Sequence, residues 1–259
     1  MSAKDNVTLF FKMVLATLLS VFTAFGGLFG GGQQSGVCMI AHRGYSGMYH
    51  ENTELAFRKA AEHGSGGAET DVRITADGEF VCSHDGTVTL KDGTELDIAD
   101  HTYEELTAQT LKRKNIGDVY LCTFERYLEV MKENDMVCFI ELKGSYTDEQ
   151  VNQVFTLAGE VYDLSRCILQ SFDFDNLLKA REQFPDLPIM LTYGEGDTGW
   201  ERCIEHGFSI DADYKVATEE MIQAFHDAGL EFAVWTANDI FSLNYCKSLG
   251  VDYIESDLF

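Results

Sequence analysis

The sequence predicts an α/β protein whose main part is a (β/α)8 TIM barrel. From residue 37 onward, short apolar runs typical of strands alternate with amphipathic patterns typical of helices, and a repeated order of strand then helix indicates a parallel sheet. The expected helix boundaries agree with this pattern. Thr102-x-x-Glu105 and Thr147-x-x-Gln150 can form capping boxes, and glycine stands where four of the helices should stop, at Gly64, Gly207, Gly229 and Gly250.

The apolar runs number nine, one more than an eight-stranded barrel needs. Segment 71–84 explains the excess, because it has no helical period and carries Asp77-Gly78 between two extended stretches, which indicates a hairpin turn. A short insertion at 86–118 follows, with a helix expected over 102–114. The eight barrel strands are predicted to start near residues 38, 67, 136, 166, 188, 208, 231 and 252.

Residues 1–36 are predicted to form a separate amino-terminal part, and residues 37–259 the catalytic barrel. The run 13–30 contains no charged side chain and follows Lys4 and Lys12, so it is interpreted as a transmembrane anchor or a cleaved signal peptide, with a buried amphipathic helix as the alternative. A glycine-rich linker follows it. The basic residues before the run favour a membrane-anchored protein with an extracytoplasmic barrel, or a secreted one.

The charge balance argues against nucleic acid as a partner. The chain has 43 acidic and 19 basic residues and a formal net charge of -24, so its surface repels polyanions. A phosphate-ester substrate would require a local reversal of this potential. A divalent cation held by some of the carboxylates would provide it.

The cysteines are interpreted as packing residues. Seven are spread evenly along the chain without a CxxC pair, which argues against a zinc ribbon or a redox motif. Several stand in apolar strand-like runs, where a reduced cysteine behaves as a small hydrophobic residue. An odd number of free thiols conflicts with an oxidising exterior.

Three carboxylates end the second and third predicted barrel strands. Glu69 and Asp71 are two residues apart and therefore lie on one face of a strand, and Glu141 on the neighbouring strand can reach them. Because three adjacent carboxylates repel one another, a hard cation such as Ca²⁺ or Mg²⁺ is the expected occupant. The alternative is a salt-bridge network with Arg73 and Lys143.

Two histidines are predicted beside these acids. His42 ends the first strand, and a two-residue turn at Asp77-Gly78 would place His84 opposite Asp71. Histidine is the side chain best suited to move protons near neutral pH, so one acts as base and the other as acid in displacement at phosphorus. The sequence does not assign the two roles, although we favour His42 as the base.

Other candidate site residues would bind the substrate. Arg43 and Lys143 supply positive charge for a phosphate, and Glu51 and Asn52 precede a helix, where Asn52 has a simple helix cap as its alternative role. Trp235 ends the seventh strand and is interpreted either as barrel packing or as a wall for an organic group.

A series of motifs in this order resembles the glycerophosphodiester phosphodiesterase family, which belongs to the phospholipase C-like phosphodiesterase superfamily. The likeness spans residues 37–259, and the motifs are AHRG at 41–44, ENT at 51–53, ETDVRITADG at 69–78, SHD at 83–85, ELK at 141–143, QSFD at 170–173, VWTAND at 234–239 and LGVDYIESD at 249–257. The order and spacing of HRG, ENT, ExD and HD are highly specific.

The resemblance implies a metal-dependent hydrolase that converts glycerophosphodiesters to glycerol 3-phosphate and an alcohol. It implies that Glu69, Asp71 and Glu141 hold the divalent metal and that His42 and His84 are the acid and base. It also implies that Arg43 and Lys143 contact the phosphate, with Glu51 and Asn52 supporting the site.

The chain departs from the family pattern at three positions. His50 stands where the family usually has proline, Cys122 replaces another proline, and an arginine is missing after His84-Asp85. These differences bear on substrate choice. Two alternatives therefore remain open: a phospholipase D-like activity on lysophospholipids or sphingolipids, and a phosphodiester-binding scaffold without catalysis.

Overall fold

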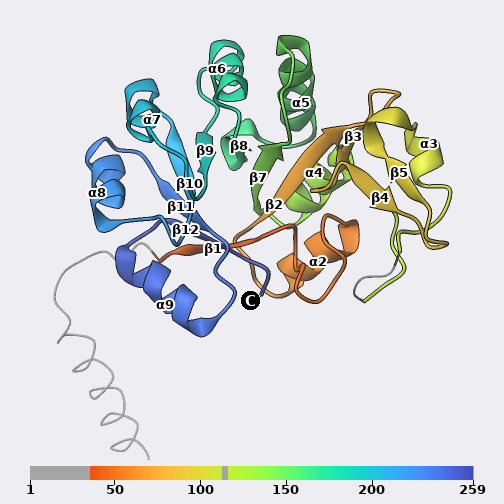
Figure 1. The fold of residues 1–259 in the computed structure, drawn as a ribbon, viewed down its shortest axis with the longest axis horizontal. Coiled ribbons are helices and arrows are strands. Elements are labelled where there is room, and N and C mark those ends of the chain that lie inside the picture. The colour runs from red at the N-terminus through yellow and green to blue at the C-terminus, as the bar shows by residue number, and fades with distance from the viewer. Residues whose placement is uncertain (1–35, 113–115, 259) are drawn as a thin grey trace, which may run out of the picture. The chain divides into compact units, whose positions relative to one another are not determined.

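The computed structural model describes residues 36–112 and 116–258, and within them eight parallel strands close into a barrel (Figure 1). The strands follow one another around the barrel in chain order, and the circle closes because the first strand pairs with both the second and the last. The predicted TIM barrel is therefore confirmed. The barrel strands are β1 (Cys38–Ala41), β2 (Gly67–Ile74), β7 (Val137–Leu142), β8 (Cys167–Ser171), β9 (Ile189–Tyr193), β10 (Ser209–Asp213), β11 (Phe232–Trp235) and β12 (Tyr253–Ser256).

Helices cover the outside of the barrel, as Figure 1 shows for α5 to α9. They are α2 (Glu54–Glu62), α4 (Phe124–Glu133), α5 (Asp148–Val161), α6 (Phe174–Gln183), α7 (Glu201–His206), α8 (Glu219–Asp227) and α9 (Ile240–Leu249), with a short 3-10 helix η2 (Leu164–Arg166). The capping box at Thr147 forms as expected at the start of α5. Gly207 and Gly250 end α7 and α9 in the left-handed conformation, which glycine adopts without steric cost.

The hairpin after β2 forms, but its register differs from the prediction by one residue. Strand β3 (Phe80–Cys82) runs antiparallel to β2 and pairs Phe80 with Ile74. Asp71 therefore lies opposite Ser83, whose N–H donates to the Asp71 carbonyl at 2.8 Å. The prediction that Asp71 faces His84 was wrong.

The reason lies in the hairpin loop. The Gly78 N–H donates to the Thr75 carbonyl, and the Thr75 N–H donates to the Glu79 carbonyl. The loop thus contains three residues, with Gly78 at φ 85 as its left-handed member, the arrangement of a turn followed by a bulge. Asp-Gly suits the two-residue and three-residue loops alike, and the two differ by one step of register.

The insertion packs as a small unit beside the hairpin. It contains β4 (Thr87–Thr89), β5 (Glu95–Asp97), η1 (Ile98–Asp100) and α3 (Tyr103–Leu106), and it is followed by β6 (Cys122–Thr123), which pairs with β3. The helix expected over 102–114 is wrong beyond its first turn, although its capping box at Thr102 forms. The described chain after α3 turns at 107–109 instead, and then Leu111 forms a bridge with Leu90 and the Lys112 N–H donates to the Thr89 carbonyl.

The barrel interior below the mouth is filled by apolar side chains. We call this set the inner layer, and it consists of Ile40, Phe139, Ile168, Met190 and Ala233, all buried. A larger core cluster packs elsewhere in the fold and includes Phe57, Phe155 and Phe225. The closed strands and the filled interior make the barrel a rigid support for side chains at its mouth.

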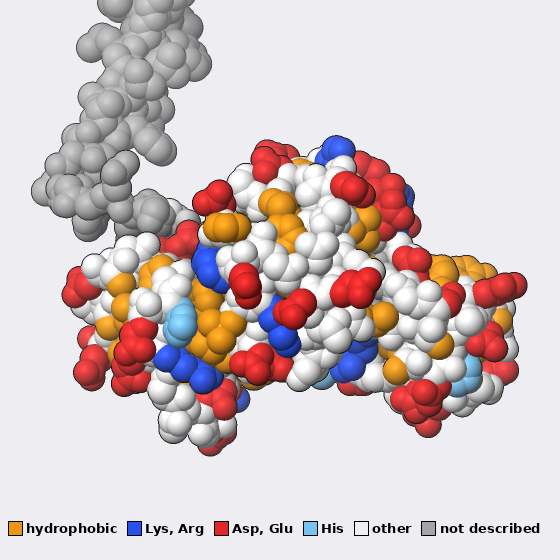
Figure 2. Space-filling view, turned by 90° about the horizontal axis from the view of Figure 1, so that it is seen from above, with side chains coloured by type: hydrophobic (Ala, Val, Ile, Leu, Met, Phe, Trp, Pro, Cys, Tyr) orange, Lys and Arg blue, Asp and Glu red, His pale blue; other side chains and the backbone are white. Residues whose placement is uncertain are grey.

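The acidic composition is visible on the face of the molecule in Figure 2, where Asp and Glu side chains are spread widely and Lys and Arg side chains are fewer. Within residues 36–112 and 116–258, no helix combines the length and apolar character needed to cross a bilayer. The predicted hydrophobic segment 13–30 lies outside the described residues.

Candidate active site

The three carboxylates predicted from the strand ends lie together at the mouth of the barrel. Strand pairing places Asp71 of β2 beside Glu141 of β7. One oxygen from each of these residues and from Glu69 lies within 4.8 Å of the others, and all three side chains are buried. Period-two alternation along β2 is the cause, because it projects Glu69 and Asp71 to the same side.

The carboxylates fit a divalent cation. Among the described residues, Glu69 Oε1 is buried without a hydrogen-bond partner. Burial, together with the charges of Asp71 and Glu255, raises the pKa of Glu69 well above its ordinary value. Burial also raises the pKa of Glu141. Three converging carboxylates, one of which has an oxygen without a hydrogen-bond partner, form the kind of oxygen donor set that Ca²⁺ or Mg²⁺ takes.

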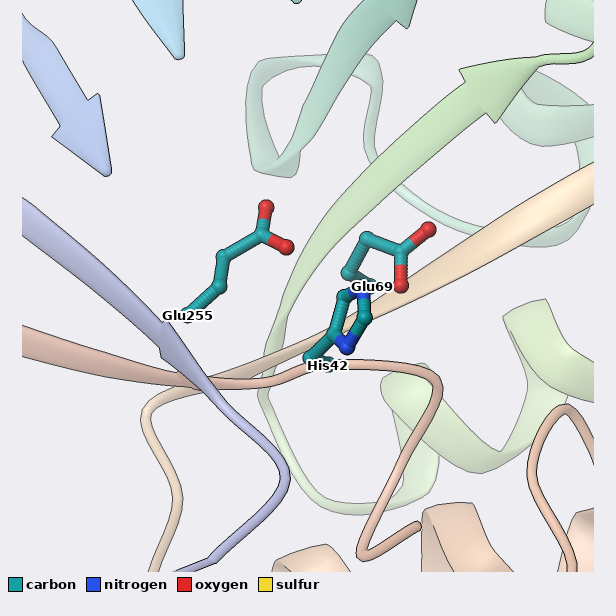
Figure 3. Close-up of side chains that lie close together, drawn as sticks. All are labelled: His42, Glu69 and Glu255. Carbon is teal, nitrogen blue, oxygen red and sulfur yellow. The ribbon is translucent and has the colours of Figure 1, made fainter. Parts of the chain in front are cut away.

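A second acidic group adjoins the first. His42, Glu69 and Glu255 of β12 lie close together in Figure 3 and offer ligand atoms within 4.8 Å of one another. Asp211 of β10 is also buried, and burial raises its pKa well above the ordinary value. Gln170 Nε2 donates to both Asp211 and Glu255, at 2.7 and 2.9 Å, and so joins the two acids.

The site predicted from the sequence did not include Gln170, Asp211 or Glu255. The signal was the same one that located the other acids, because Gln170, Asp211 and Glu255 end or nearly end the apolar runs of the fourth, sixth and eighth barrel strands. The mouth layer, defined here as the residues two positions beyond the inner layer, comprises His42, Glu141, Gln170, Thr192 and Trp235.

Two cations face the acids. Lys143 Nζ lies 2.8 Å from Asp71 Oδ1 and 2.7 Å from Glu141 Oε1. Arg43 Nε lies 3.4 Å from Asp71 Oδ2. Although burial opposes ionisation, Lys143 and Arg43 hold the pKa of Asp71 below its ordinary value. Arg73, the other partner in the salt-bridge alternative, donates to the His84 carbonyl instead.

A tight turn after β1 directs main-chain atoms into the site. Arg43 has φ 58 and Gly44 has φ 75, and the Arg43 N–H donates to Glu69 Oε2 at 2.8 Å. A Cβ atom on Gly44 would lie 2.7–2.9 Å from Ala56 and Phe57 atoms of α2, closer than real Cβ atoms approach. Glycine is therefore required there by both its φ and its close packing.

Asn52 orients Asp71 and does not cap a helix. Its Nδ2 donates to Asp71 Oδ2 at 2.7 Å, and its Oδ1 accepts from the Thr70 hydroxyl at 2.8 Å. The cap of α2 is Thr53. Glu51 accepts from the Arg43 guanidinium at 3.2 Å. The two residues thus fix one acid and one cation of the site.

His42 is held by an acid from the last strand's end. Its Nδ1 lies 2.7 Å from Asp257 Oδ1, which also accepts from the Ser46 hydroxyl at 2.9 Å. Although burial opposes ionisation, the contact with His42 helps hold the pKa of Asp257 below its ordinary value. A carboxylate on Nδ1 favours the tautomer that protonates this nitrogen and leaves Nε2 as an acceptor.

His84 comes from the hairpin and, despite the change in register, lines a hollow at the barrel mouth together with His42. Its side chain is 38% exposed, and its Nδ1 hydrogen-bonds Asp85 at 2.9 Å. Arg73 fixes its main chain through the carbonyl contacts described above. His42, His84, Arg43, Glu141 and Lys143 all line this hollow, whose volume is about 120 Å³.

An aromatic wall closes one side of the hollow. The rings of Trp235 and Phe172 lie edge to face with their centroids 6.1 Å apart. Trp235 Nε1 donates to the Asp211 carbonyl at 3.1 Å. Trp235 therefore packs the barrel and also lines the hollow, so both interpretations of this residue describe part of its position.

Comparisons with known proteins agree on one family. Residues 42–258 match the model of the glycerophosphoryl diester phosphodiesterase family. A curated relative, a glycerophosphodiester phosphodiesterase from Caldanaerobacter subterraneus, is 29% identical over 226 residues, which cover 85% of this chain and 93% of the relative.

Solved structures show the same fold. A glycerophosphodiester phosphodiesterase from Thermotoga maritima superposes with a TM-score of 0.70 and 29% identity, over 87% of this chain and 96% of that one. A phosphodiesterase from Oleispira antarctica, in complex with the product sn-glycerol-3-phosphate, has a TM-score of 0.75 and 21% identity, over 85% and 92% of the two chains.

Proposed function

The chain belongs to the glycerophosphodiester phosphodiesterase family, and from this premise we propose how its residues divide the work of catalysis. The enzyme is a phosphoric diester hydrolase that converts glycerophosphodiesters to glycerol 3-phosphate and an alcohol. One observation carries the proposal for the mechanism: two histidines, two cations and Glu141 of the acidic cluster line a single hollow at the barrel mouth, with Glu69 and Asp71 next to Glu141.

Glu69, Asp71 and Glu141 would hold Ca²⁺ or Mg²⁺, since their oxygens converge and Glu69 Oε1 has no other partner among the described residues. When bound, the cation would supply charge stabilisation at a phosphoryl oxygen. The residues around the acids keep them in place: the Arg43 amide fixes Glu69, and Asn52 fixes Asp71.

His42 is proposed as the general base. Asp257 binds Nδ1, so Nε2 is available to accept a proton from the attacking hydroxyl of water or of the substrate. The ionised Asp257 stabilises the imidazolium that this transfer creates. Ser46 and Asn238 also bind the Asp257 carboxylate, which holds it in position during the transfer.

His84 is proposed as the general acid. It lines the hollow together with His42, but it comes from the hairpin, and its side chain is more exposed than that of His42, at 38% against 15%. An exposed position suits proton delivery to an alcohol that leaves toward solvent. Asp85 on Nδ1 orients the ring.

Arg43 and Lys143 are proposed to bind the phosphate oxygens, and Glu51 orients the Arg43 guanidinium. Trp235 and Phe172 would cover the carbon skeleton of the glycerol. The Oleispira antarctica protein, which has the same fold, is in complex with the product sn-glycerol-3-phosphate, and this supports a glycerol phosphate as a ligand here.

A product analysis tests this function and its lipid alternative. The full chain is incubated with glycerophosphocholine or with a lysophospholipid, with Ca²⁺, with Mg²⁺ and with chelator. We expect cation-dependent release of glycerol 3-phosphate from glycerophosphocholine. Preferred turnover of the lysophospholipid would favour the phospholipase D-like alternative, and full activity in chelator would contradict the metal assignment.

The amino-terminal part is proposed to direct the barrel to a membrane or out of the cytoplasm. The uncharged run after Lys12 supports this proposal. We expect the full chain to partition with membranes or to lose about its first 24–30 residues. Recovery of the intact chain from the soluble fraction would count against both the membrane anchor and the cleaved signal peptide.

A further inference from the structure

Two cysteines face each other where the hairpin meets the strand before α4. Strands β3 and β6 run antiparallel with Cys82 opposite Cys122. Directly opposed residues project to the same face with Cα atoms about 4.5 or 5.5 Å apart, and both separations lie within the range of about 4.4–6.8 Å that a disulfide spans. Both Sγ atoms also contact the Thr123 carbonyl oxygen, at 3.6 Å for Cys82 and 3.4 Å for Cys122.

Each of these thiols also lies in the wall of a hollow. Cys82 lines a hollow of about 410 Å³ between the barrel and the insertion. Cys122 lines another of about 400 Å³ beside α2 and α4. Each cysteine therefore borders a hollow large enough for a small reagent, although both side chains are buried.

A second cysteine pair serves as an internal comparison. Cys138 and Cys167 lie opposite each other on β7 and β8, and both are 0% exposed. Neither lines the two hollows that reach the first pair. In both pairs the two cysteines lie opposite each other on neighbouring strands, but only Cys82 and Cys122 line these hollows.

We propose that Cys82 and Cys122 form a covalent modification site that takes low-molecular-weight disulfides. One thiolate attacks the reagent, breaks its S–S bond and releases one reagent thiolate. The second cysteine then attacks the mixed disulfide, forms the Cys82–Cys122 bond and releases the second. The reagent is reduced to two thiols, which take up the two cysteine protons, and the protein pair is oxidised.

The bridge would fasten the catalytic hairpin. Cys82 precedes His84 by two residues on the same strand end, and Cys122 stands two residues before α4. The closed loop contains β4, β5 and α3, which form the insertion. Because a disulfide restricts the unfolded chain, the oxidised protein should resist unfolding more than the reduced one. This proposal goes beyond the hydrolytic function and does not rest on it.

Peptide mapping tests the site directly. The full chain, purified with reductant and exchanged into buffer, is incubated with oxidised glutathione at mildly alkaline pH, because burial raises the pKa of the Cys82 thiol. Remaining thiols are then alkylated in denaturant and the digest is analysed by mass. We expect one bridge, Cys82 to Cys122, with the other five of the seven cysteines alkylated. Alkylation of all seven, a bridge at Cys138–Cys167, or a glutathione adduct on Cys82 without a bridge would overturn the proposal.

Thermal unfolding gives a second measurement. Oxidation should raise Tm by roughly 5–15 °C. Cys82→Ala and Cys122→Ala should each lose this rise, whereas the matched control Cys138→Ala should keep it, each compared with its own reduced form. A rise retained by Cys122→Ala would also overturn the proposal, and the peptide map of the wild-type chain decides the matter if a variant does not fold.

Discussion

Two consecutive layers of the same barrel strands have opposite chemistry. The inner layer holds apolar side chains such as Phe139, and two residues further along β7 the mouth layer holds Glu141. A step of two residues along the strand likewise leads from apolar Ile40 to His42 and from apolar Met190 to Thr192. Both layers are set by the same period-two alternation, so one register positions the packing and the chemistry together.

The comparison shows how the barrel supports a destabilising site. Burying carboxylates without full compensation costs free energy, and Glu69, Asp211 and Glu255 all have pKa values raised by burial. The layer beneath them gains free energy from buried apolar surface. We therefore expect inner-layer changes to alter stability, and changes in the mouth layer or in the buried acids beside it to alter activity.

The largest expected effect is on stability. Phe139 is 0% exposed and its ring contacts Tyr253 edge to face. Phe139→Ala should lower the free energy of unfolding by about 3–5 kcal/mol, because it removes buried contacts and leaves a cavity, as urea denaturation would measure. The kcat of the remaining folded enzyme should stay near that of wild type. A comparable loss of kcat would show that the two layers are not separable.

Glu69→Gln should have the opposite pattern. We expect kcat/KM to fall by roughly a thousandfold, which corresponds to the several kcal/mol that a bound cation supplies. The free energy of unfolding in chelator should be unchanged or higher, since a neutral amide replaces a buried carboxylate of raised pKa. Steady-state kinetics and denaturation of the same preparation test both parts, and a marked loss of stability would contradict the second.

The histidines should show a smaller effect on activity. His42→Ala and His84→Ala should each lower kcat by about a hundredfold or more and leave cation binding largely intact. A nitrophenyl phosphodiester, whose leaving group needs no proton, should restore turnover to the variant that lacks the acid, which we propose is His84→Ala. Rescue of both variants to the same extent would remove the role assignment, and wild-type turnover in both would refute the mechanism.

The smallest effect lies on the outer surface, where charges are paired in solvent. Hydrogen bonds from Arg126 and Arg58 lower the pKa of Glu54 to about 2. A depressed pKa stabilises the fold above the ordinary pKa of 4.5, and this contribution is lost as pH falls from there toward 2. Because Glu54 is 41% exposed, Glu54→Gln should cost less than about 1 kcal/mol at pH 7. Denaturation at pH 7 and pH 3 should show the difference shrinking, whereas a constant difference would exclude the ion pairs as its cause.

The sequence predicted the barrel with little error because its signals are local. All eight strands begin within one residue of the predicted positions. Apolar runs, capping boxes and glycine stops depend on near neighbours in the chain, and the acids at Glu69, Asp71 and Glu141 follow from the same periodicity.

Other features depend on contacts that no local pattern encodes. His42 hydrogen-bonds Asp257, which lies near the other end of the amino-acid sequence. This pairing exists only once the barrel closes. The register of the hairpin depends on whether Gly78 is the second or third loop residue, and a left-handed glycine suits both loops. Gln170, Asp211 and Glu255 also stand at or near strand ends and could have been predicted. The polar residues at the ends of those strands were not included in the predicted site.

The left-handed turn at Arg43 and Gly44 has a consequence for how this site can be dissected by mutation. Glu69 is oriented by an amide that every residue type except proline possesses, so replacing the Arg43 side chain removes a cation without releasing the carboxylate. An alanine substitution at Arg43 would therefore not reveal what orients Glu69. The orientation depends instead on Gly44, where any side chain would collide with α2. An engineer who transplants this site must therefore copy the main-chain path before choosing its side chains.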